Sequence, residues 1–207
     1  MFYSQKELID TMKTRWYLKT KKIIYAFNRV DRKDFVQDEW WGNVYWDFPL
    51  PIWSWQTISQ PSTVAFMLEL LRPEKSENIL DIGSGSWWTT ALLAEIVWKW
   101  WSVLWLERVD ELVGFWSENL NKYNFKNASI EKADKTLWKR GEEFDKILVS
   151  AWADMLPQEL VKQLQIWWIM VIPIKNSICR IKKISEDDYS LKEFQGFIFV
   201  PLIDDTG

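Results

Sequence analysis

The sequence predicts an α/β fold in which a mainly parallel sheet is flanked by helices and preceded by N-terminal helices. Short apolar runs alternate with helical patterns from residue 78 onwards, and parallel strands need such crossover segments between them. The first apolar run ends in a turn that contains Gly83 and Gly85. These features favour a sheet whose ligand site lies beyond the carboxyl ends of its strands.

Two groups of apolar residues recur at helical spacing before the sheet begins. They are Leu8, Ile9 and Met12, followed by Ile23, Ile24 and Phe27. Residues three and four positions apart lie on one face of a helix, so we expect two amphipathic helices ahead of the core.

Four strands are expected in succession, at residues 78–82, 102–106, 128–131 and 146–150. Residues 89–97 and 110–123 fit connecting helices, the second with Asp110 as its N-cap, and a helix at 157–164 opens with Pro157 in its first turn. Further strands, separated by turn residues at 175–177 and 186–188, fill the region from 169 to 200. The chain shows no repeat or linker, so its 207 residues fit one domain.

Composition narrows the classes of function. The net charge of -3 provides no strong attraction for nucleic acid. The chain has no histidine and one cysteine, Cys179, which excludes a Cys/His metal site and an internal disulfide. The first residues are polar rather than signal-like, and no apolar run is long enough to span a bilayer. We therefore expect a cytoplasmic protein that binds neither nucleic acid nor membranes.

The segment from Ile79 to Ser86 joins an apolar strand to a glycine-containing turn ahead of a helix. Such a turn lets a ligand approach the backbone, and the amides at the helix start favour negative or polar groups. Glu107 ends the next strand, about twenty residues further on, where nucleotide-binding units place the acid that binds the ribose hydroxyls. A dinucleotide motif places a third glycine at 88 and a methyltransferase motif at 87, but both positions hold Trp. The spacing therefore allows three interpretations. The turn binds a nicotinamide cofactor, it binds S-adenosylmethionine, or it only joins a strand to a helix and binds no ligand.

The most distinctive segment is Gln56-Thr57-Ile58-Ser59-Gln60-Pro61, which follows the apolar residues 49–52. It closely resembles the signature of the protein-L-isoaspartate (D-aspartate) O-methyltransferase family. Further segments also resemble parts of that family, in the same order along nearly the whole chain. They are residues 80–86, 106–108, 144–151, 171–173 and 199–202. The resemblance implies a Rossmann-like, S-adenosylmethionine-dependent methyltransferase fold. It divides the single domain into a helical region with a substrate and cofactor segment at 1–60 and a Rossmann-like core at 61–207.

The resemblance also implies a binding site made of residues that follow the strands. For S-adenosylmethionine these are Gln56, Thr57, Ile58, Asp81, Gly83, Ser84, Gly85, Ser86, Glu107, Arg108, Asp134 and Lys135. Glu107 would accept from the ribose hydroxyls and Asp134 from the adenine amino group. Alternatively, Asp81 and Asp134 cap loops, and Glu107 pairs with Arg108 or a lysine. For the substrate, the implied residues are Ser59, Val200, Pro201 and Leu202.

The implied reaction is methylation of the carboxylate of L-isoaspartyl and D-aspartyl residues in damaged proteins and peptides. The methyl ester closes to a succinimide that reopens in part to normal aspartate, which begins repair. The substrate carboxylate is ionised near neutral pH, since its reference pKa is about 4, so the absence of histidine is no obstacle. Ser59 is the expected catalytic residue, which hydrogen-bonds and orients that carboxylate; the alternative is a turn or helix-cap residue. We expect the chain to act as a monomer.

Tryptophan is unusually frequent, with 17 residues against 7 glycines. Several tryptophans stand where the family prefers glycine or another small residue: Trp53, Trp55, Trp87, Trp101, Trp152 and the pair Trp167-Trp168. We expect the side chain of Trp87 to point into or beside the cofactor space. Three explanations are open: the molecule differs from the written sequence, the chain is an altered variant, or it keeps the fold without activity. The first is favoured because one fold would hardly absorb so many glycine losses.

Other functions remain open on the sequence alone. The glycine turn equally allows a methyltransferase of the same fold that acts on RNA or a small molecule. A catalytically silent module that binds isoaspartyl proteins is favoured if the tryptophans close the site. A nucleic-acid stacking surface would need basic residues interleaved with the rings, and only fragments such as Trp138-Lys139-Arg140 are present.

Overall fold

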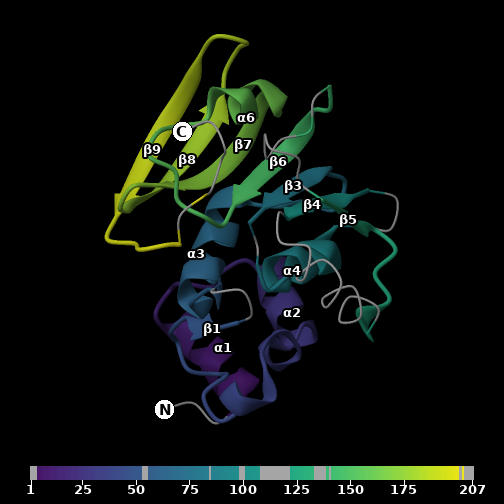
Figure 1. Ribbon diagram of the computed structural model, residues 1–207, viewed down its shortest axis with the longest axis vertical. Coiled ribbons are helices and arrows are strands. Elements are labelled where there is room, and N and C mark those ends of the chain that lie inside the picture. Colours follow the sequence, from purple (N-terminus) through teal and green to yellow (C-terminus); the bar gives the residue numbers. More distant parts are fainter. Residues whose placement is uncertain are drawn as a thin grey trace.

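The computed structural model describes residues 4–52, 56–83, 85–97, 101–107, 122–132, 139, 141–200 and 202. Its centre is a seven-stranded sheet with the order β5-β4-β3-β6-β7-β8-β9 (Figure 1). The strands are β3 (Ile79–Ile82), β4 (Val103–Glu107), β5 (Ala128–Lys132), β6 (Phe144–Val149), β7 (Leu164–Ile174), β8 (Ser177–Lys183) and β9 (Tyr189–Gln195). Pairs from β5 to β7 are parallel, whereas β8 and β9 are antiparallel additions at one edge. The prediction of a mainly parallel sheet is confirmed.

Strand β3 lies at the point where the chain reverses its direction across the sheet. From β3 the chain moves to β4 and β5 on one side, and then returns to β6 and β7 on the other. The last residue of β3, Ile82, pairs with Leu106 of β4 and with Val149 of β6. A crevice forms at such a reversal because the connections leave the carboxyl ends in opposite directions.

All four residues of β3 are buried, as expected for a central parallel strand covered on both faces. Ile79 belongs to one apolar cluster, while Leu80 and Ile82 belong to another. This division follows the two-residue period of a strand, which sends alternate side chains to opposite faces. The sheet therefore separates two cores.

One core lies under the helices that precede and follow the cofactor-like turn. It joins residues of α1 (Gln5–Thr14), α2 (Lys21–Arg29), α3 (Pro61–Leu71) and α4 (Trp88–Ile96) to one face of the sheet. The other core includes Leu160 and Val161 of α6 (Gln158–Gln163). Figure 1 shows α1 to α4 below β3 and β4, with α6 beside β7 at the far end. Helices thus cover both faces, which confirms the layered arrangement expected from the sequence.

The N-terminal helices confirm the periodicity of the sequence. Leu8, Ile9 and Met12 are buried on α1, and Ile23 and Phe27 on α2, while Ile24 is partly buried. The hydroxyl of Ser4 accepts from the Glu7 amide and caps α1. The four strands expected between residues 78 and 150 and the helix at 89–97 also form, within two residues of their predicted ends. In the region expected to hold strands from 169 to 200, β7 begins five residues earlier, at Leu164, and β9 ends five residues earlier, at Gln195.

Other local features differ from the predictions or lie beyond them. Pro157 is the N-cap of α6 rather than a member of its first turn. The expected helix at 110–123 falls outside the described residues except for its last two. The sequence pattern did not predict α3 or the two short 3-10 helices, which are η1 (Arg32–Phe35) and η2 (Asp38–Trp40). It also did not predict the hairpin formed by β1 (Leu50–Pro51) and β2 (Thr57–Ile58). Within the described ranges, no helix is long and apolar enough to cross a membrane.

The start of α3 is held by an acid from an earlier loop. Pro61 occupies the first turn, where the missing amide hydrogen costs nothing, and Gln60 provides no side-chain cap. Instead, Oδ1 of Asp47 accepts from the Ser62 amide at 2.9 Å. This bond satisfies one of the free amides of the helix and ties α3 to the loop before β1.

Candidate active site

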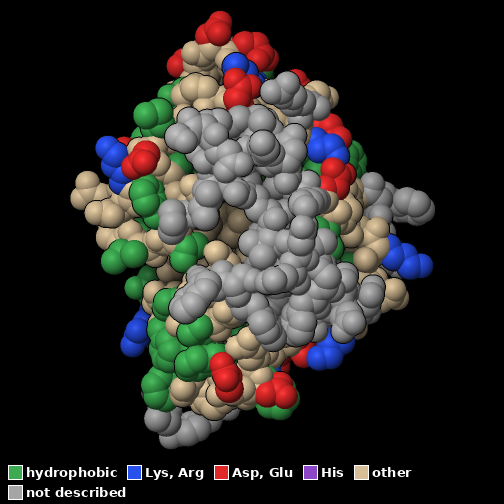
Figure 2. All heavy atoms as spheres, in the orientation of Figure 1, with side chains coloured by type: hydrophobic (Ala, Val, Ile, Leu, Met, Phe, Trp, Pro, Cys, Tyr) green, Lys and Arg blue, Asp and Glu red, His purple; other side chains and the backbone are tan. Residues whose placement is uncertain are grey.

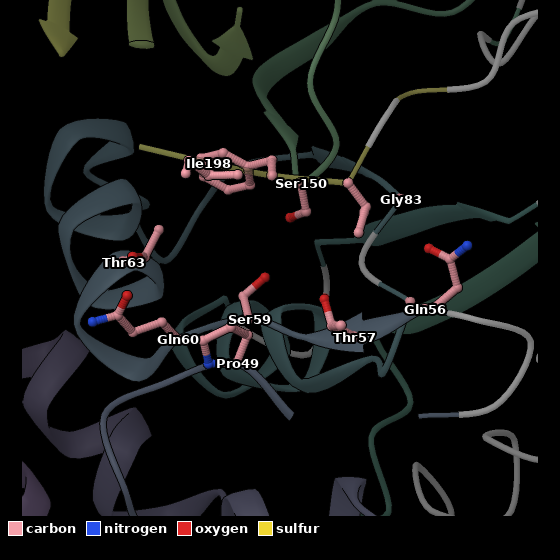
Figure 3. A pocket seen from close by; sticks show the side chains of 12 residues that line it. Pro49, Gln56, Thr57, Ser59, Gln60, Thr63, Gly83, Ser150 and Ile198 are labelled. Atoms are coloured by element: carbon pink, nitrogen blue, oxygen red, sulfur yellow. The ribbon is translucent and has the colours of Figure 1, made fainter. Parts of the chain in front are cut away.

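A cavity of about 240 Å³ lies at the carboxyl ends of β3 and β6, where the reversal of the sheet predicts a ligand site. Its walls come from the loop before β1, the β2–α3 segment, the turn after β3, the end of β6 and the chain after β9 (Figure 3). The lining residues are Pro49, Gln56, Thr57, Ser59, Gln60, Thr63, Gly83, Gly85, Ser150, Ile198, Phe199 and Val200. Five segments that are distant in sequence thus meet around one space.

The turn after β3 has backbone angles that suit glycine. Gly83 and Gly85 have φ angles of +69° and +55°, in the left-handed region that side chains disfavour. A Cβ on Gly83 would lie 3.4 Å from the Cβ of Ala151. A Cβ on Gly85 would lie 3.6 Å from Ile52 Cδ1 and 3.7 Å from the Thr57 carbonyl oxygen. The turn is therefore packed closely against the β1–β2 hairpin.

The hairpin brings Gln56 and Thr57 to the cavity beside this turn. β1 and β2 pair antiparallel, and the Ile52 amide donates to the Gln56 carbonyl at 2.9 Å. Ile58 is fully buried, so its side chain supports the wall from behind rather than lining it. The segment 56–59 therefore presents polar side chains to the cavity and anchors itself through an apolar one.

Ser59 and Ser150 project into the cavity from opposite walls (Figure 3). Ser150 directly follows β6, and its amide donates to the Ile82 carbonyl at 2.8 Å, which fixes it beside the end of β3. Thr57 and Thr63, the latter in the first turn of α3, add two further hydroxyls. None of the twelve lining residues is ionisable near neutral pH. Among these lining residues, an anionic group would meet hydroxyl and amide donors and no fixed negative charge.

The chain after β9 closes one side of the cavity. The Trp152 amide donates to the Val200 carbonyl at 2.9 Å, and the Leu202 amide donates to the Trp152 carbonyl at 2.7 Å. Val200 lines the cavity together with Ile198 and Phe199. Leu202 instead packs against the second core. Of the residues expected to meet the substrate, Ser59 and Val200 therefore share one cavity.

Asp81 and Ser86 lie behind the glycine turn. Asp81 is fully buried, and its Oδ2 accepts from the hydroxyls of Thr89 at 3.0 Å and Thr90 at 2.7 Å. The Ser86 hydroxyl accepts from the Trp88 amide at 3.4 Å. These bonds join the turn to the first residues of α4. They agree with the alternative in which Asp81 caps the loop.

Several expected site residues lie outside the described part of the chain. They are Ser84, Arg108, Asp134, Lys135 and Pro201. The backbone of Glu107 ends β4, next to the pairing of Leu106 with Ile82, but its side chain is not described. Its assignment to the ribose hydroxyls stays a prediction.

Trp87, which was expected to point into or beside the cofactor space, does not line this cavity. Its side chain is fully buried and packs edge-on against Trp105, with ring centroids 4.2 Å apart. Burial of a large apolar ring in the core is favourable, which explains the inward rotation. Trp53 and Trp55 lie outside the described residues.

Some lining residues were missed in the sequence. Thr63 stands in a helix that apolar periodicity did not reveal, because α3 is buried over most of its surface. Ile198 and Phe199 are ordinary apolar residues whose role appears only when the chain crosses the end of β6. Gln60 and Pro49 lie within the block that carries the family resemblance, but they were not among the expected site residues.

Other reactive groups are absent from the described part of the site. Burial raises the pKa of the Cys179 thiol to about 11, so it is protonated at neutral pH and does not serve as a nucleophile. No group of three Cys, Asp or Glu side chains suited to a metal occurs within the described ranges. Among the described lining residues, the polar groups are hydroxyls, side-chain amides and backbone groups.

Comparison with known proteins gives a consistent family. The family described as protein-L-isoaspartate(D-aspartate) O-methyltransferase matches residues 3–207. A protein-L-isoaspartate O-methyltransferase of Thermococcus sibiricus is 34% identical over 97% of this chain and 93% of its own length. A Petrotoga mobilis protein of the same name is 36% identical over 97% and 95%.

Solved structures agree on the fold. A Plasmodium falciparum protein, described as a protein-L-isoaspartate O-methyltransferase in complex with S-adenosyl-L-homocysteine, has a TM-score of 0.85 at 24% identity and covers 99% of this chain and 100% of its own. Another protein-L-isoaspartate O-methyltransferase has a TM-score of 0.87 at 20% identity, over 99% of this chain and 67% of its own. With the family match over nearly all of its length, this chain belongs to the protein-L-isoaspartate (D-aspartate) O-methyltransferase family.

Proposed function

We propose that the cavity between the glycine turn and the β2–α3 segment is where this chain methylates isoaspartyl carboxylates. As a member of its family, the chain is an S-adenosylmethionine-dependent methyltransferase that acts on isoaspartyl residues of proteins. The observation that carries the proposed location is the meeting of Gly83 and Gly85 with Gln56, Thr57 and Ser59 around one cavity. A cofactor cradle and a substrate-orienting hydroxyl must be adjacent for direct methyl transfer.

The glycine turn fits the proposed cofactor role. Both glycines line the cavity, and their positive φ angles form a tight turn that other residues disfavour. Gln56 and Thr57 offer amide and hydroxyl groups beside it, and α4 begins just after it. When bound, S-adenosylmethionine supplies an activated methyl group. Glu107, at the end of the adjacent strand β4, is proposed to accept from the ribose hydroxyls, with Arg108, Asp134 and Lys135 completing the site.

The chain's part in the reaction is to orient the substrate and to exclude water. The isoaspartyl carboxylate is already ionised, so no protein group has to remove a proton. The Ser59 hydroxyl donates to one carboxylate oxygen in this proposal, and Ser150 and Thr63 are placed for further hydrogen bonds. Holding the reacting groups in line supplies several kcal/mol.

The chain after β9 is proposed to contact the polypeptide substrate. Ile198, Phe199 and Val200 form an apolar side of the cavity, and two backbone bonds with Trp152 hold the following residues in place. Apolar walls displace water from the carboxylate, which strengthens its remaining hydrogen bonds. Pro201 and Leu202 would extend this contact.

We also propose that residues 1–207 act as one monomeric domain in the cytoplasm, without nucleic acid or membrane. The net charge of -3 supports the absence of a nucleic-acid partner, and the Lys and Arg side chains visible on the face in Figure 2 lie apart from one another, most of them close to Asp or Glu. Sedimentation equilibrium should give the mass of one chain, and calorimetry one unfolding transition. A concentration-dependent dimer or two separate transitions would contradict this proposal.

Methyl transfer to a peptide with one isoaspartyl residue tests the function, with the same peptide carrying normal aspartate as the control. Label from S-adenosylmethionine should appear on the isoaspartyl peptide alone. Replacement Ser59→Ala should lower kcat/KM by about 10- to 100-fold, because a hydrogen bond to a charged group contributes about 1.5–3 kcal/mol. Ser190→Ala, on the exposed side of β9, should leave the rate unchanged.

Each failure has a separate meaning in this assay. Binding of S-adenosylhomocysteine without label on either peptide would favour the silent binding module. Label on both peptides would contradict selection of the isoaspartyl group. A rate unaffected by Ser59→Ala would remove the proposed role of Ser59 while leaving the function intact.

The glycine turn is tested by Gly85→Ala, with Gly141→Ala as its matched control. Both glycines have positive φ, but a Cβ at 85 meets the hairpin, whereas nothing lies within 4 Å of one at 141. Both variants should lose about 1–2 kcal/mol of stability from backbone strain. Only Gly85→Ala should also raise the Kd for S-adenosylhomocysteine, by about tenfold. Calorimetric titration with equal affinity in both variants would place the cofactor away from this turn.

A further inference from the structure

Arg32 is buried behind the cavity, yet its guanidinium makes all its described hydrogen bonds to backbone. Only 1% of the residue is exposed. Nη1 donates to the carbonyls of Val44 at 2.5 Å and Trp46 at 3.3 Å, and Nη2 donates to those of Phe48 at 3.0 Å and Ser59 at 3.2 Å. Burial lowers the pKa of Arg32 to about 9, while the nearby charge of Asp47 acts in the other direction and raises it. The side chain therefore stays cationic at neutral pH.

The four carbonyls belong to two segments that end at the cavity. Residues 44–48 lead directly into Pro49, and Ser59 supplies the central hydroxyl. Within the first segment, Asp47 also accepts from Ser62 in the first turn of α3. A planar guanidinium can bind several carbonyls at fixed angles, which the single ammonium group of lysine does not reproduce. One side chain thus sets the separation of the two segments.

We propose that Arg32 is a positioning residue for methyl transfer, which holds the Ser59 peptide so that its hydroxyl faces the substrate carboxylate. Arg32 does not line the cavity, and it acts through the backbone of residues that do. This inference rests on the proposed function of the cavity. A buried charge costs desolvation that an apolar side chain would avoid, and here Nη1 and Nη2 bind carbonyls while the buried Nε has no hydrogen-bond partner among the described residues. A purely space-filling role therefore does not account for Arg32.

The test is Arg32→Lys, with Arg180→Lys as the matched control. Arg180 also donates to a backbone carbonyl, that of Leu70 at 3.0 Å, but near the other end of α3. Arg32→Lys should lower kcat for the isoaspartyl peptide by about 10- to 100-fold, because small misplacements of an orienting group have effects of this size. The Kd for S-adenosylhomocysteine should stay close to that of the unaltered protein. Arg180→Lys should leave both quantities unchanged.

Amide hydrogen exchange tests the positioning role of Arg32 independently of the proposed methyl transfer. Exchange in residues 57–64 should be faster in Arg32→Lys than in the unaltered protein and in Arg180→Lys. If the unaltered protein transfers no methyl group, the proposed function fails, while exchange still decides whether Arg32 holds this segment. Unchanged exchange or unchanged kcat would overturn the positioning role. Should Arg32→Lys not fold, Arg32→Gln, which buries no charge and keeps two donors, takes its place in both measurements.

A second inference comes from three tryptophans with left-handed backbone. Trp16, Trp87 and Trp167 have φ angles of 63°, 69° and 75°, within the range of the described positive-φ glycines. Large side chains disfavour this region, whereas glycine enters it freely. Five buried indole N–H groups, including that of Trp87, also lack a hydrogen-bond partner among the described residues; they belong to Trp40, Trp46, Trp87, Trp88 and Trp105.

Each of the three tryptophans occupies a different kind of turn in which glycine is common. Trp16 follows the C-cap of α1, where its amide donates to Lys13 and that of Tyr17 donates to Met12, the bonds of a Schellman motif. Trp87 is the N-cap of α4. Trp167 lies where β7 bulges against β6, between the pairings at Leu164 and Ile169. Three unrelated turns therefore share the same unfavourable residue.

We infer that positions 16, 87 and 167 are glycine positions, and that the protein made by its own cell carries glycine at them. Two of the tryptophans gain little from burial, since Trp16 is 74% and Trp167 62% exposed. The source cell would translate one codon as glycine, whereas the printed sequence translates the same codon as tryptophan. Every position with that codon would then show tryptophan in the printed sequence and glycine in the protein. This cause also accounts for 17 tryptophans beside 7 glycines.

Peptide mass mapping of the protein from its source cell tests this inference directly. Peptides that span positions 16, 87 and 167 should each have the mass of glycine. On the printed sequence, Trp16→Gly should raise the thermal midpoint by about 2–4 °C, and Trp16→Ala should raise it less because alanine keeps the Cβ. Trp41→Gly is the control, since Trp41 is exposed but has a φ of -56°. Tryptophan masses in the source protein, or equal midpoints for Trp16→Gly and Trp16→Ala, would overturn the inference.

Discussion

The complete burial of β3 is the constraint on which the rest of the structure depends. Because β3 pairs with β4 on one edge and β6 on the other, it ends at a fixed point between two strands that run in the same direction. The chain must leave that point in a tight turn, and Gly83 and Gly85 supply the backbone angles that the turn requires. The hairpin strands β1 and β2 then pack against the turn, which brings Ser59 to the same edge.

Polar groups around this edge have two separate duties. Buried ones hold the frame: Asp81 binds the threonines of α4, Asp47 binds the start of α3, and Arg32 binds four carbonyls. Those that reach the cavity are neutral hydroxyls and amides, which suit a substrate that brings its own negative charge. A methyl transfer to an ionised carboxylate needs orientation more than proton removal, so a chain without histidine can carry it.

The sequence predicts elements whose signal is local. Amphipathic periodicity gives α1 and α2, and strand–helix alternation gives the parallel sheet, because both patterns report which face is buried. It does not predict α3, which is apolar on most sides, nor the approach of Ile198 and Phe199, which depends on the path of the chain after β9. Ser59 could be predicted only because the QTISQP segment resembles a family signature, whereas the turn with Gly83 and Gly85 follows from the local strand-to-helix pattern. Arg32 has no local signal at all, since its partners are carbonyls up to 27 residues away.

A crystal structure of the protein with S-adenosylhomocysteine and an isoaspartyl peptide tests the central claim most directly. The claim is that one cavity, at the carboxyl ends of β3 and β6, serves both cofactor and substrate. We expect the cofactor product against Gly83 and Gly85, with the isoaspartyl carboxylate hydrogen-bonded to Ser59 and the peptide along residues 198–200. A carboxylate bound away from Ser59, or a cofactor product outside the glycine turn, would contradict it.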